Sequence, residues 1–367
     1  MRSYLDYAGI GVVRPAARKA MASAIEDVLA NGGTAYGAFF VARERARRAA
    51  ARLLEASEDE IALLSNTSEG LQLVASGLRW APGDEVVVFD RDFPANVQPW
   101  RRLADLGVRL RFVPMRDGGY DLDDVAASIG PATRLVAVSH VNFITGFRID
   151  LNAVCALARE VDALVSVDAV QSIGALPLSV TDTPVDFVAA GGHKWMCGPP
   201  GTGVLFCRRD RLDLLERAPA GWFGYEGAQD MLVRGEPGHF TYERELRPTA
   251  RRFEGGMPNM MGFVGLAEAL EEIESIGLPA IAERVLGLAG ALRAGLIERG
   301  FEVLGPDHQD ARSGIVTFAP ENPREIYDRL STAGFALSFP DGRLRLAPHY
   351  WTSMDEIDAV LMGISSV

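Results

Sequence analysis

Short apolar runs alternate with amphipathic stretches between about residues 58 and 210. Seven of the runs have the length and nearly continuous apolar character of buried strands: 61–64, 85–89, 108–113, 134–139, 163–167, 186–190 and 203–207. Stretches with helical periodicity, at 68–78, 95–106 and 151–161, separate several of them. Apolar strands that alternate with helices predict an α/β fold, in which a mainly parallel seven-stranded sheet is covered by helices. Ligands of such sheets bind at the carboxyl ends of the strands.

The pattern changes after about residue 255. Two long helical stretches, 258–275 and 279–299, precede a smaller set of strands and helices, at 301–304, 314–318, 322–332, 335–338, 343–347 and 354–364. We therefore predict a large domain over 15–254 and a smaller C-terminal α+β domain over 255–367. Residues 1–14 are expected to pack against the smaller domain.

The formal net charge of −12 argues against nucleic acid or an anionic membrane as a partner, because both attract a positive surface. No apolar run reaches the roughly 20 residues of a membrane span, and the N-terminus lacks the apolar core of a signal peptide. We expect a cytoplasmic protein. The densest basic stretch, 43–48, is interrupted by Glu44, and we interpret it as a solvated helix face.

Cysteine and lysine are both rare in this chain. The cysteines, Cys155, Cys197 and Cys207, are odd in number and widely spaced, so we expect small buried residues and neither a disulfide framework nor a metal site. Only two of the 37 basic residues are lysines. Lys19 is interpreted as a solvated helix residue, whereas Lys194 follows a buried strand. An amine can lose its proton and attack a carbonyl, which a guanidinium cannot, so Lys194 is the candidate nucleophile.

Asp168 and Lys194 follow two successive strands and are expected at the same edge of the sheet. A carboxylate beside a lysine suits pyridoxal-5′-phosphate (PLP), because the acid keeps the pyridine nitrogen protonated while the amine carries the aldehyde as an imine. The alternative is that Asp168 caps a turn and Lys194 is a solvated loop residue.

Two further segments end at the same predicted edge. The hydroxyl groups of Thr67 and Ser68 precede a helix, where free N–H groups make a phosphate site; ordinary helix capping by either residue is the alternative. Phe93 follows a strand and could stack on a flat cofactor, although an isolated Phe is more often part of the core.

The segment 198–203 looks like a nucleotide-binding P-loop, but Val204 and Leu205 stand where Lys and Ser or Thr are needed. We interpret it as a glycine-rich turn.

The sequence Ser166-Val-Asp-Ala-Val-Gln171, followed by Gly192-His-Lys194 and the glycine-rich turn, resembles the class V aminotransferase family, which has the fold-type I PLP architecture. That family includes cysteine desulfurases, kynureninases and isopenicillin-N-epimerase-like proteins. The likeness extends from Tyr4 to His349. It implies that PLP is the cofactor and that the protein is a homodimer with active sites at the subunit interface.

The resemblance also implies roles for individual residues. Lys194 would form the Schiff base, Asp168 would pair with the pyridine nitrogen, and Gln171 would reach the ring hydroxyl. Phe93 would stack on the ring. The phosphate would contact Thr67, Ser68 and His193. Arg345 would hold the substrate carboxylate by a bidentate pair; a surface cross-strand charge is its alternative.

The chain departs from the family pattern in two places. The loop that carries a cysteine in desulfurases reads Ala336-Leu-Ser-Phe-Pro-Asp-Gly342, which disfavours persulfide formation on the enzyme. Met257 stands where relatives have a Thr that reaches the phosphate of the neighbouring subunit. A thioether cannot donate a hydrogen bond, so this contact would be lost or would fall to backbone N–H groups of Gly256 and Met257. Phe143 and Tyr225 are expected to shape the substrate pocket, with core packing as the alternative.

These residues predict an enzyme that attaches the amine of a small amino-acid substrate to PLP as an external aldimine and then removes its Cα proton. We favour elimination at a Cβ–S bond, by a lyase of specialised metabolism. Transamination is the first alternative. Decarboxylation, epimerisation and non-catalytic PLP binding are the others.

Overall fold

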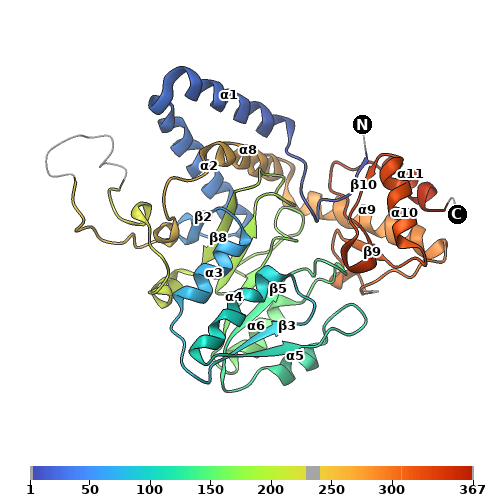
Figure 1. Cartoon of the computed structure of the whole chain (residues 1–367), viewed down its shortest axis with the longest axis horizontal. Coiled ribbons are helices and arrows are strands. Elements are labelled where there is room, and N and C mark those ends of the chain that lie inside the picture. Colours follow the sequence, from blue (N-terminus) through green and yellow to red (C-terminus); the bar gives the residue numbers. More distant parts are fainter. Residues whose placement is uncertain (1–2, 229–239, 307, 366–367) are drawn as a thin grey trace.

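The computed structural model describes residues 3–228, 240–306 and 308–365 (Figure 1). A central sheet with helices on both faces makes up the larger part of the molecule, and a smaller unit of helices and short strands lies at one end. Leu5, near the start of the chain, and residues of the last quarter of the chain share the core of the smaller unit (Figure 1). The assignment of residues 1–14 and 255–367 to one domain stays a prediction.

The central sheet has seven strands, and their order is β2 (Ile61–Leu64), β8 (Gly203–Cys207), β7 (Phe187–Gly191), β6 (Leu164–Asp168), β5 (Thr133–Ser139), β3 (Glu85–Phe89) and β4 (Arg109–Val113). Strand β8 runs antiparallel to both of its neighbours, β2 and β7, and all other neighbouring strands of this sheet are parallel. Every residue of β6, β7 and β8 is buried, as expected for strands covered on both faces. The prediction of a mainly parallel seven-stranded sheet is confirmed.

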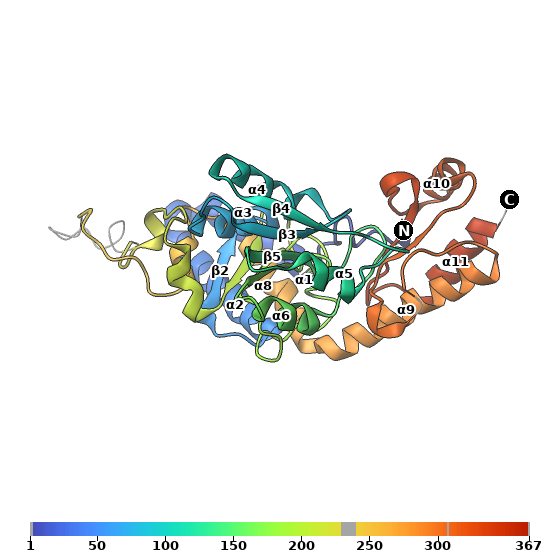
Figure 2. The same ribbon diagram turned by 90° about the horizontal axis from the view of Figure 1, so that it is seen from below.

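Helices cover the two faces of the sheet, each around its own apolar core (Figure 2). One face packs against α3 (Thr67–Gly77) and α4 (Gln98–Arg101). The other packs against α2 (Tyr36–Leu54), α5 (Leu122–Ser128), α6 (Leu151–Arg159) and α8 (Met260–Ile276). Helix α1 (Pro15–Asn31) lies against α8.

The stretch 95–106 does not form the single helix that its periodicity predicts. Pro94 begins a 3-10 turn at Pro94–Asn96, and Pro99 stands in the first turn of the short helix α4. A second 3-10 segment, Arg102–Leu106, follows. Proline is tolerated in the first turn of a helix but not inside it, so each proline restarts the helix.

The smaller unit has a core of its own, which includes Leu5 and the C-terminal helices. Its elements are β1 (Ser3–Tyr4), α9 (Leu278–Glu298), β9 (Val316–Phe318), α10 (Pro323–Thr332), β10 (Phe335–Ala336), β11 (Leu344–Leu346) and α11 (Met354–Ser365). Strand β1 pairs in parallel with β10, and β11 pairs antiparallel with β9. The strand predicted at 301–304 is wrong, because only Val303 forms an isolated bridge there.

The domain boundary stays a prediction, but the packing suggests where to move it. Helix α8 shares the core of the larger part, whereas the core of the smaller unit takes residues of α9 from Leu288 onward. The two helices meet at an 86° bend around Gly277, which has a positive φ of 91°. We therefore propose a boundary at this bend instead of at residue 254.

Among the described residues, no single helix is long and apolar enough to cross a membrane. Helices α8 and α9 pass that test of length and composition only as a pair, across their bend.

The interpretation of residues 43–48 as a solvated helix face is wrong. Arg43 and Arg47, on α2, are buried, and their guanidinium groups bind the buried carboxylate of Glu254. Arg48 is exposed, so only part of the basic stretch faces water. A buried arginine is tolerated where a carboxylate pairs with it. Lys19 is exposed, as predicted.

Candidate active site

Asp168 and Lys194 lie at the carboxyl edge of the central sheet. Asp168 is the last residue of β6 and pairs with Ala189 of the neighbouring strand β7, which ends three residues before Lys194. The carboxylate is buried, and one oxygen accepts a hydrogen bond of 3.0 Å from the backbone N–H of Val170. Asp168 therefore caps the turn that follows β6, as the alternative interpretation has it, but it does so as a buried carboxylate.

Burial moves the pKa values of both groups toward neutrality. It raises the pKa of Asp168 to about 7 and lowers that of Lys194 to about 8, while the charge of each partly offsets the shift of the other. Perturbed, mutually coupled groups at a sheet edge are typical of active sites. The interpretation of Lys194 as a solvated residue is wrong, because most of its surface is covered.

Phe93 presents a partly open ring beside the lysine. It follows β3, and its ring centroid lies 5.4 Å from Lys194 Nζ. The residue is 41% exposed, so it does not belong to the core. Phe143 meets it edge to face, with ring centroids 5.1 Å apart. The two rings form an apolar wall next to the amine.

The N-terminus of α3 faces the same space. Asn66 caps this helix, since its side chain accepts a hydrogen bond from Glu69 N–H, so the capping role considered for Thr67 and Ser68 is wrong. Thr67 Oγ1 accepts from Gly191 N–H at 2.8 Å and ties α3 to the end of β7. Ser68 and Phe93 line one cavity of about 950 Å³.

His193 and Gln171 flank the lysine. His193 is half-buried. Its pKa is lowered mainly by this burial and, to a lesser extent, by the positive charge of the neighbouring Lys194. The Gln171 amide is fixed at both ends, because Nε2 donates to Ala8 O at 3.0 Å and Oε1 accepts from Trp195 Nε1 at 2.8 Å. One N–H of the amide remains for a further acceptor.

Arg345, on β11, reaches the site from the smaller unit. Its side chain is buried and donates to Ser338 Oγ at 2.9 Å, to Phe143 O at 2.7 Å and to Asp6 Oδ1 at 3.3 Å. The surface-charge alternative is therefore wrong. A guanidinium has five N–H donors, so two remain for a ligand. Arg345 and Lys194 are close enough for the arginine charge to lower the lysine pKa.

Three predicted residues are not brought against Lys194 within one chain. Tyr225 follows the 3-10 turn Trp222–Gly224 and bridges to Leu246, and its role in the pocket stays a prediction. Gly256 and Met257 follow Gly255, which lines the same cavity as Ser68. Met257 is 53% exposed, and its contact with a second subunit stays a prediction.

The N-terminal segment 5–11 was not predicted as part of the site. Asp6 pairs with Arg345, Ala8 O accepts from Gln171, and Gly11 N–H donates 2.7 Å to His193 O. The sequence signal was the likeness that begins at Tyr4, which marks the segment without saying what it touches. The geometry shows that it lies across the carboxyl edge of the sheet.

The residues present fit PLP. Asp168 is a buried carboxylate with no hydrogen-bonded cation among the described residues, and a protonated pyridine nitrogen would supply one. The exposed Phe93 ring offers a face for stacking, and the α3 N-terminus with Ser68 suits a phosphate. Lys194 supplies the amine that an aldehyde requires. One set of neighbouring groups therefore meets each chemical need of the cofactor.

The chain matches the family profile described as Aminotransferase class-V over residues 3–337. It is 32% identical over 337 residues to a probable cysteine desulfurase of Pyrococcus abyssi, a match that covers 87% of this chain and 81% of the relative. It is 29% identical to an uncharacterized aminotransferase of Bacillus subtilis, with 90% and 85% covered.

Solved structures resemble the whole molecule. The cystine C–S lyase C-DES in complex with its reaction product, cysteine persulfide, superposes with a TM-score of 0.88 at 26% identity and covers 100% of this chain and 97% of its own. A C-DES variant with glycine covalently linked to the PLP cofactor gives a TM-score of 0.89 at 25% identity, covering 100% and 96%. The cysteine desulfurase of Thermococcus onnurineus gives 0.87 at 26%, with 99% and 94% covered.

Proposed function

The chain belongs to the class V aminotransferase family, as a PLP-dependent enzyme, and from that premise we propose that it is a lyase that cleaves the Cβ–S bond of a cysteine derivative such as cystine. Elimination from cystine consumes one water and yields cysteine persulfide, pyruvate and ammonia. The sulfur then leaves on the product and needs no acceptor on the enzyme.

The burial of the three cysteines is the observation that supports this proposal most strongly. Cys155, Cys197 and Cys207 are all free and at most 3% exposed. Burial raises the pKa of the Cys155 and Cys197 thiols to about 12 and that of Cys207 still further. Because the thiolate is the nucleophile, none of the three can take up sulfur from a substrate. A desulfurase that stores sulfur on its own cysteine is therefore disfavoured.

The loop before β11 supports the same choice. Relatives named as desulfurases resemble this chain, yet the segment 336–342 holds Ser338, whose hydroxyl accepts from Arg345. In this chain the loop 336–342 contains no cysteine, and Ser338 orients the side chain of Arg345.

Each residue of the site has a task in such an elimination. Bound PLP supplies an electron sink for the electrons released at Cα. Arg345 binds the substrate carboxylate through its two remaining N–H donors, which fixes Cα near Lys194. Lys194, whose pKa of about 8 leaves a useful neutral fraction near pH 7–8, takes the Cα proton. Asp168 holds the proton on the pyridine nitrogen.

The apolar wall and the phosphate groups position the reactants. Phe93 stacks on the cofactor ring, and Phe143 limits the room beside the substrate side chain. Ser68, Thr67 and His193 hold the phosphate, with backbone N–H groups of Gly256 and Met257 from a second subunit. Burial of Lys194 favours its neutral form, because desolvation lowers the pKa of the amine.

A homodimer completes the proposal. Exposed apolar side chains gather on α1 and the start of α2, where Ile25, Leu29, Tyr36 and Val41 are 41–75% exposed. Such residues are typical of an interface between subunits. Light scattering after size-exclusion chromatography should give twice the mass of one chain; a monomer that turns over at full rate would refute the dimer.

The test mixes the PLP-loaded protein with cystine in the absence of any keto acid. Pyruvate and ammonia in equal amounts, with persulfide in solution, are the expected products. A parallel assay with cysteine and a thiol acceptor tests desulfuration, in which alanine and the persulfide of the acceptor would form in place of pyruvate. Conversion of the cofactor to its pyridoxamine form in either assay would mean transamination. A variant with all three cysteines changed to Ala should keep its turnover within about twofold, because no thiol takes part; loss of turnover with an unchanged fold would refute the lyase.

A further inference from the structure

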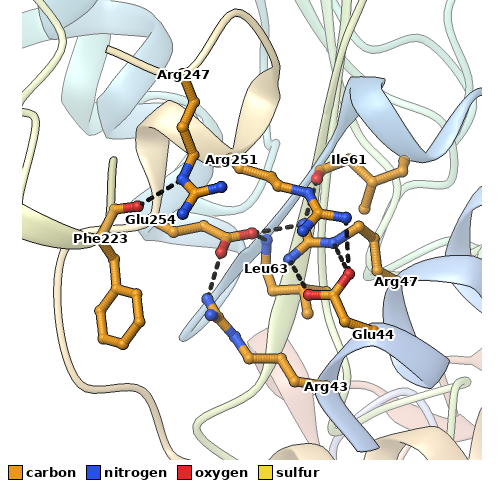
Figure 3. A network of polar contacts seen from close by, with 9 residues as sticks. All are labelled: Arg43, Glu44, Arg47, Ile61, Leu63, Phe223, Arg247, Arg251 and Glu254. Carbon is orange, nitrogen blue, oxygen red and sulfur yellow. Dashed lines mark hydrogen bonds and ion pairs between the residues drawn. The ribbon is translucent and has the colours of Figure 1, made fainter. Parts of the chain in front are cut away.

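Two buried polar networks join distant parts of the chain. One is charged and is centred on Glu254, which pairs with Arg43 and Arg47 of α2 (Figure 3). The other connects neutral groups and lies next to Lys194. Its centre is Trp195, which directly follows the lysine and is 1% exposed. Because this side chain is covered on all sides, any effect that it has on the site passes through the residues that it contacts.

The indole of Trp195 fixes one end of the Gln171 side chain. Trp195 Nε1 donates a hydrogen bond of 2.8 Å to Gln171 Oε1. An indole N–H can only donate, so the oxygen end of the amide must face it. At the other end, Gln171 Nε2 donates 3.0 Å to the carbonyl oxygen of Ala8, which can only accept. The two partners therefore select the same orientation of the amide, and the second N–H of Nε2 remains for an acceptor in the site.

The ring of Trp195 is held in place by close packing. The rings of Tyr7 and His349 lie near it, with centroids 6.5 and 5.3 Å away. Gly314 also packs against the indole, and a Cβ at this glycine would lie 2.5 Å from Cη2 of the ring. A densely packed ring has little freedom to turn, so the direction of its N–H is fixed.

The backbone of Trp195 is fixed by His349, in the loop after β11. His349 Nδ1 accepts from the backbone N–H of Tyr350 at 2.8 Å, so the proton of the neutral ring is on Nε2, which donates 2.8 Å to the carbonyl oxygen of Trp195. Burial lowers the pKa of His349 to about 4, so the ring is neutral near pH 7. A donor from the smaller unit thus holds the backbone of the residue that follows Lys194.

We infer that Trp195 is a positioning residue that orients the Gln171 amide so that an N–H, and not the carbonyl oxygen, meets the ring hydroxyl of PLP. This inference rests on the proposed binding of PLP and on the proposed contact of Gln171 with that hydroxyl. An amide turned the other way would place two oxygens against each other. A donor stabilises the ionised form of the ring hydroxyl and so weakens the hold of this oxygen on the proton of the imine that Lys194 forms. Trp195 therefore lowers the pKa of that imine through Gln171.

Replacement of Trp195 by Phe tests the inference, because it keeps an aromatic ring but removes the N–H donor. Trp80→Phe is the matched control. The Trp80 indole also donates 2.8 Å, to the carbonyl oxygen of Ala75, but it lies beyond the C-terminal end of α3, whereas the N-terminus of this helix faces the site. The visible absorbance of each PLP-loaded protein is titrated with pH. Trp195→Phe should raise the pKa of the imine by about half to one unit, the size of one hydrogen bond, and Trp80→Phe should leave it unchanged.

A double variant separates this role from a general loss of structure. Gln171→Ala alone should raise the pKa of the imine at least as much, and addition of Trp195→Phe should then change it by less than about 0.3 unit, because no amide remains to be oriented. Additive shifts would overturn the inference, as would an unchanged pKa in Trp195→Phe.

A second variant keeps the test decisive if Trp195→Phe does not fold. Incorporation of 3-benzothienylalanine at position 195 replaces the indole N–H by sulfur at nearly the same size, and a wild-type pKa of the imine in that protein would contradict the role. Failure of the proposed function shows itself separately, as wild-type protein that gains no visible absorbance with PLP or releases no pyruvate.

Discussion

Replacement of Asp168 by Asn probes the site before any cofactor is bound. The carboxylate is buried, and burial raises its pKa from 3.8 to about 7. Asn has the same shape, and its amide oxygen can still accept the hydrogen bond from Val170 N–H. The substitution therefore removes the charge with little other change.

The sign of the effect follows from proton linkage. A carboxyl whose pKa is higher in the folded protein than in the unfolded chain binds its proton more tightly when folded, so wild-type stability falls as the pH rises from 3.8 to about 7. The slope is about 1.4 kcal/mol per pH unit. The interval from pH 5 to pH 8 includes about two pH units of this window, from pH 5 to about pH 7. The free energy of unfolding of the wild type therefore falls by about 3 kcal/mol over this interval. Asn has no proton to lose. Cofactor-free Asp168→Asn should thus gain about 3 kcal/mol relative to wild type over that interval.

Urea unfolding of both cofactor-free proteins at pH 5 and pH 8 measures this gain. Glu321→Gln, an exposed carboxylate in a loop, is the control for pH effects elsewhere in the chain. Saturating PLP should reverse the order, because the wild-type carboxylate then pairs with the pyridine nitrogen and ligand binding stabilises the folded state. A stability difference that is the same at both pH values would refute the assignment of a buried, titrating carboxylate to residue 168.

Three further outcomes are expected. Covalent capture of PLP by the cofactor-free protein should accelerate as the pH rises through about 8, since burial lowers the pKa of Lys194 and only the neutral amine attacks; stopped-flow absorbance checks this, with Lys194→Ala giving no capture. Arg345→Lys should lower kcat/KM roughly 30- to 100-fold, mainly through KM and without loss of PLP, because the bidentate fork is lost; steady-state kinetics with cystine would contradict this if KM stays unchanged. Gly11→Ala should destabilise the protein by about 1–3 kcal/mol in a thermal melt, because the new Cβ would overlap the Lys194 carbonyl oxygen, whereas Gly130→Ala has open space and serves as the control.

The residues at the strand ends could be predicted because their placement depends on local order. Asp168 and Lys194 each follow a wholly buried apolar run, and parallel strands bring their carboxyl ends together. The same reasoning placed Phe93 after β3. Helix boundaries were predicted within a few residues except at 95–106, where the two prolines decide the outcome.

Contacts between distant segments could not be predicted in this way. Arg43 and Glu254 are 211 positions apart, and nothing in a basic stretch tells a solvated arginine from one that meets a buried carboxylate. A charge pattern of one segment predicts a solvated face by default, because burial of a charge is costly without a partner. Met257 shows the same limit, since the contact that we propose for it involves a second subunit.

The N-terminal segment links parts of the site that belong to different units of the fold. Asp6 pairs with Arg345 on β11, whereas Gly11 N–H binds the carbonyl oxygen of His193 beside Lys194. In the reaction that we propose, the groups that bind the substrate carboxylate and remove the Cα proton are therefore joined by one short stretch of chain. Asp6 also compensates the buried guanidinium charge when no substrate carboxylate is present, so the arginine stays oriented instead of withdrawing toward water. Because Asp6 and Gly11 belong to the same short segment, the Arg345 guanidinium and the backbone beside Lys194 are joined through residues 6–11.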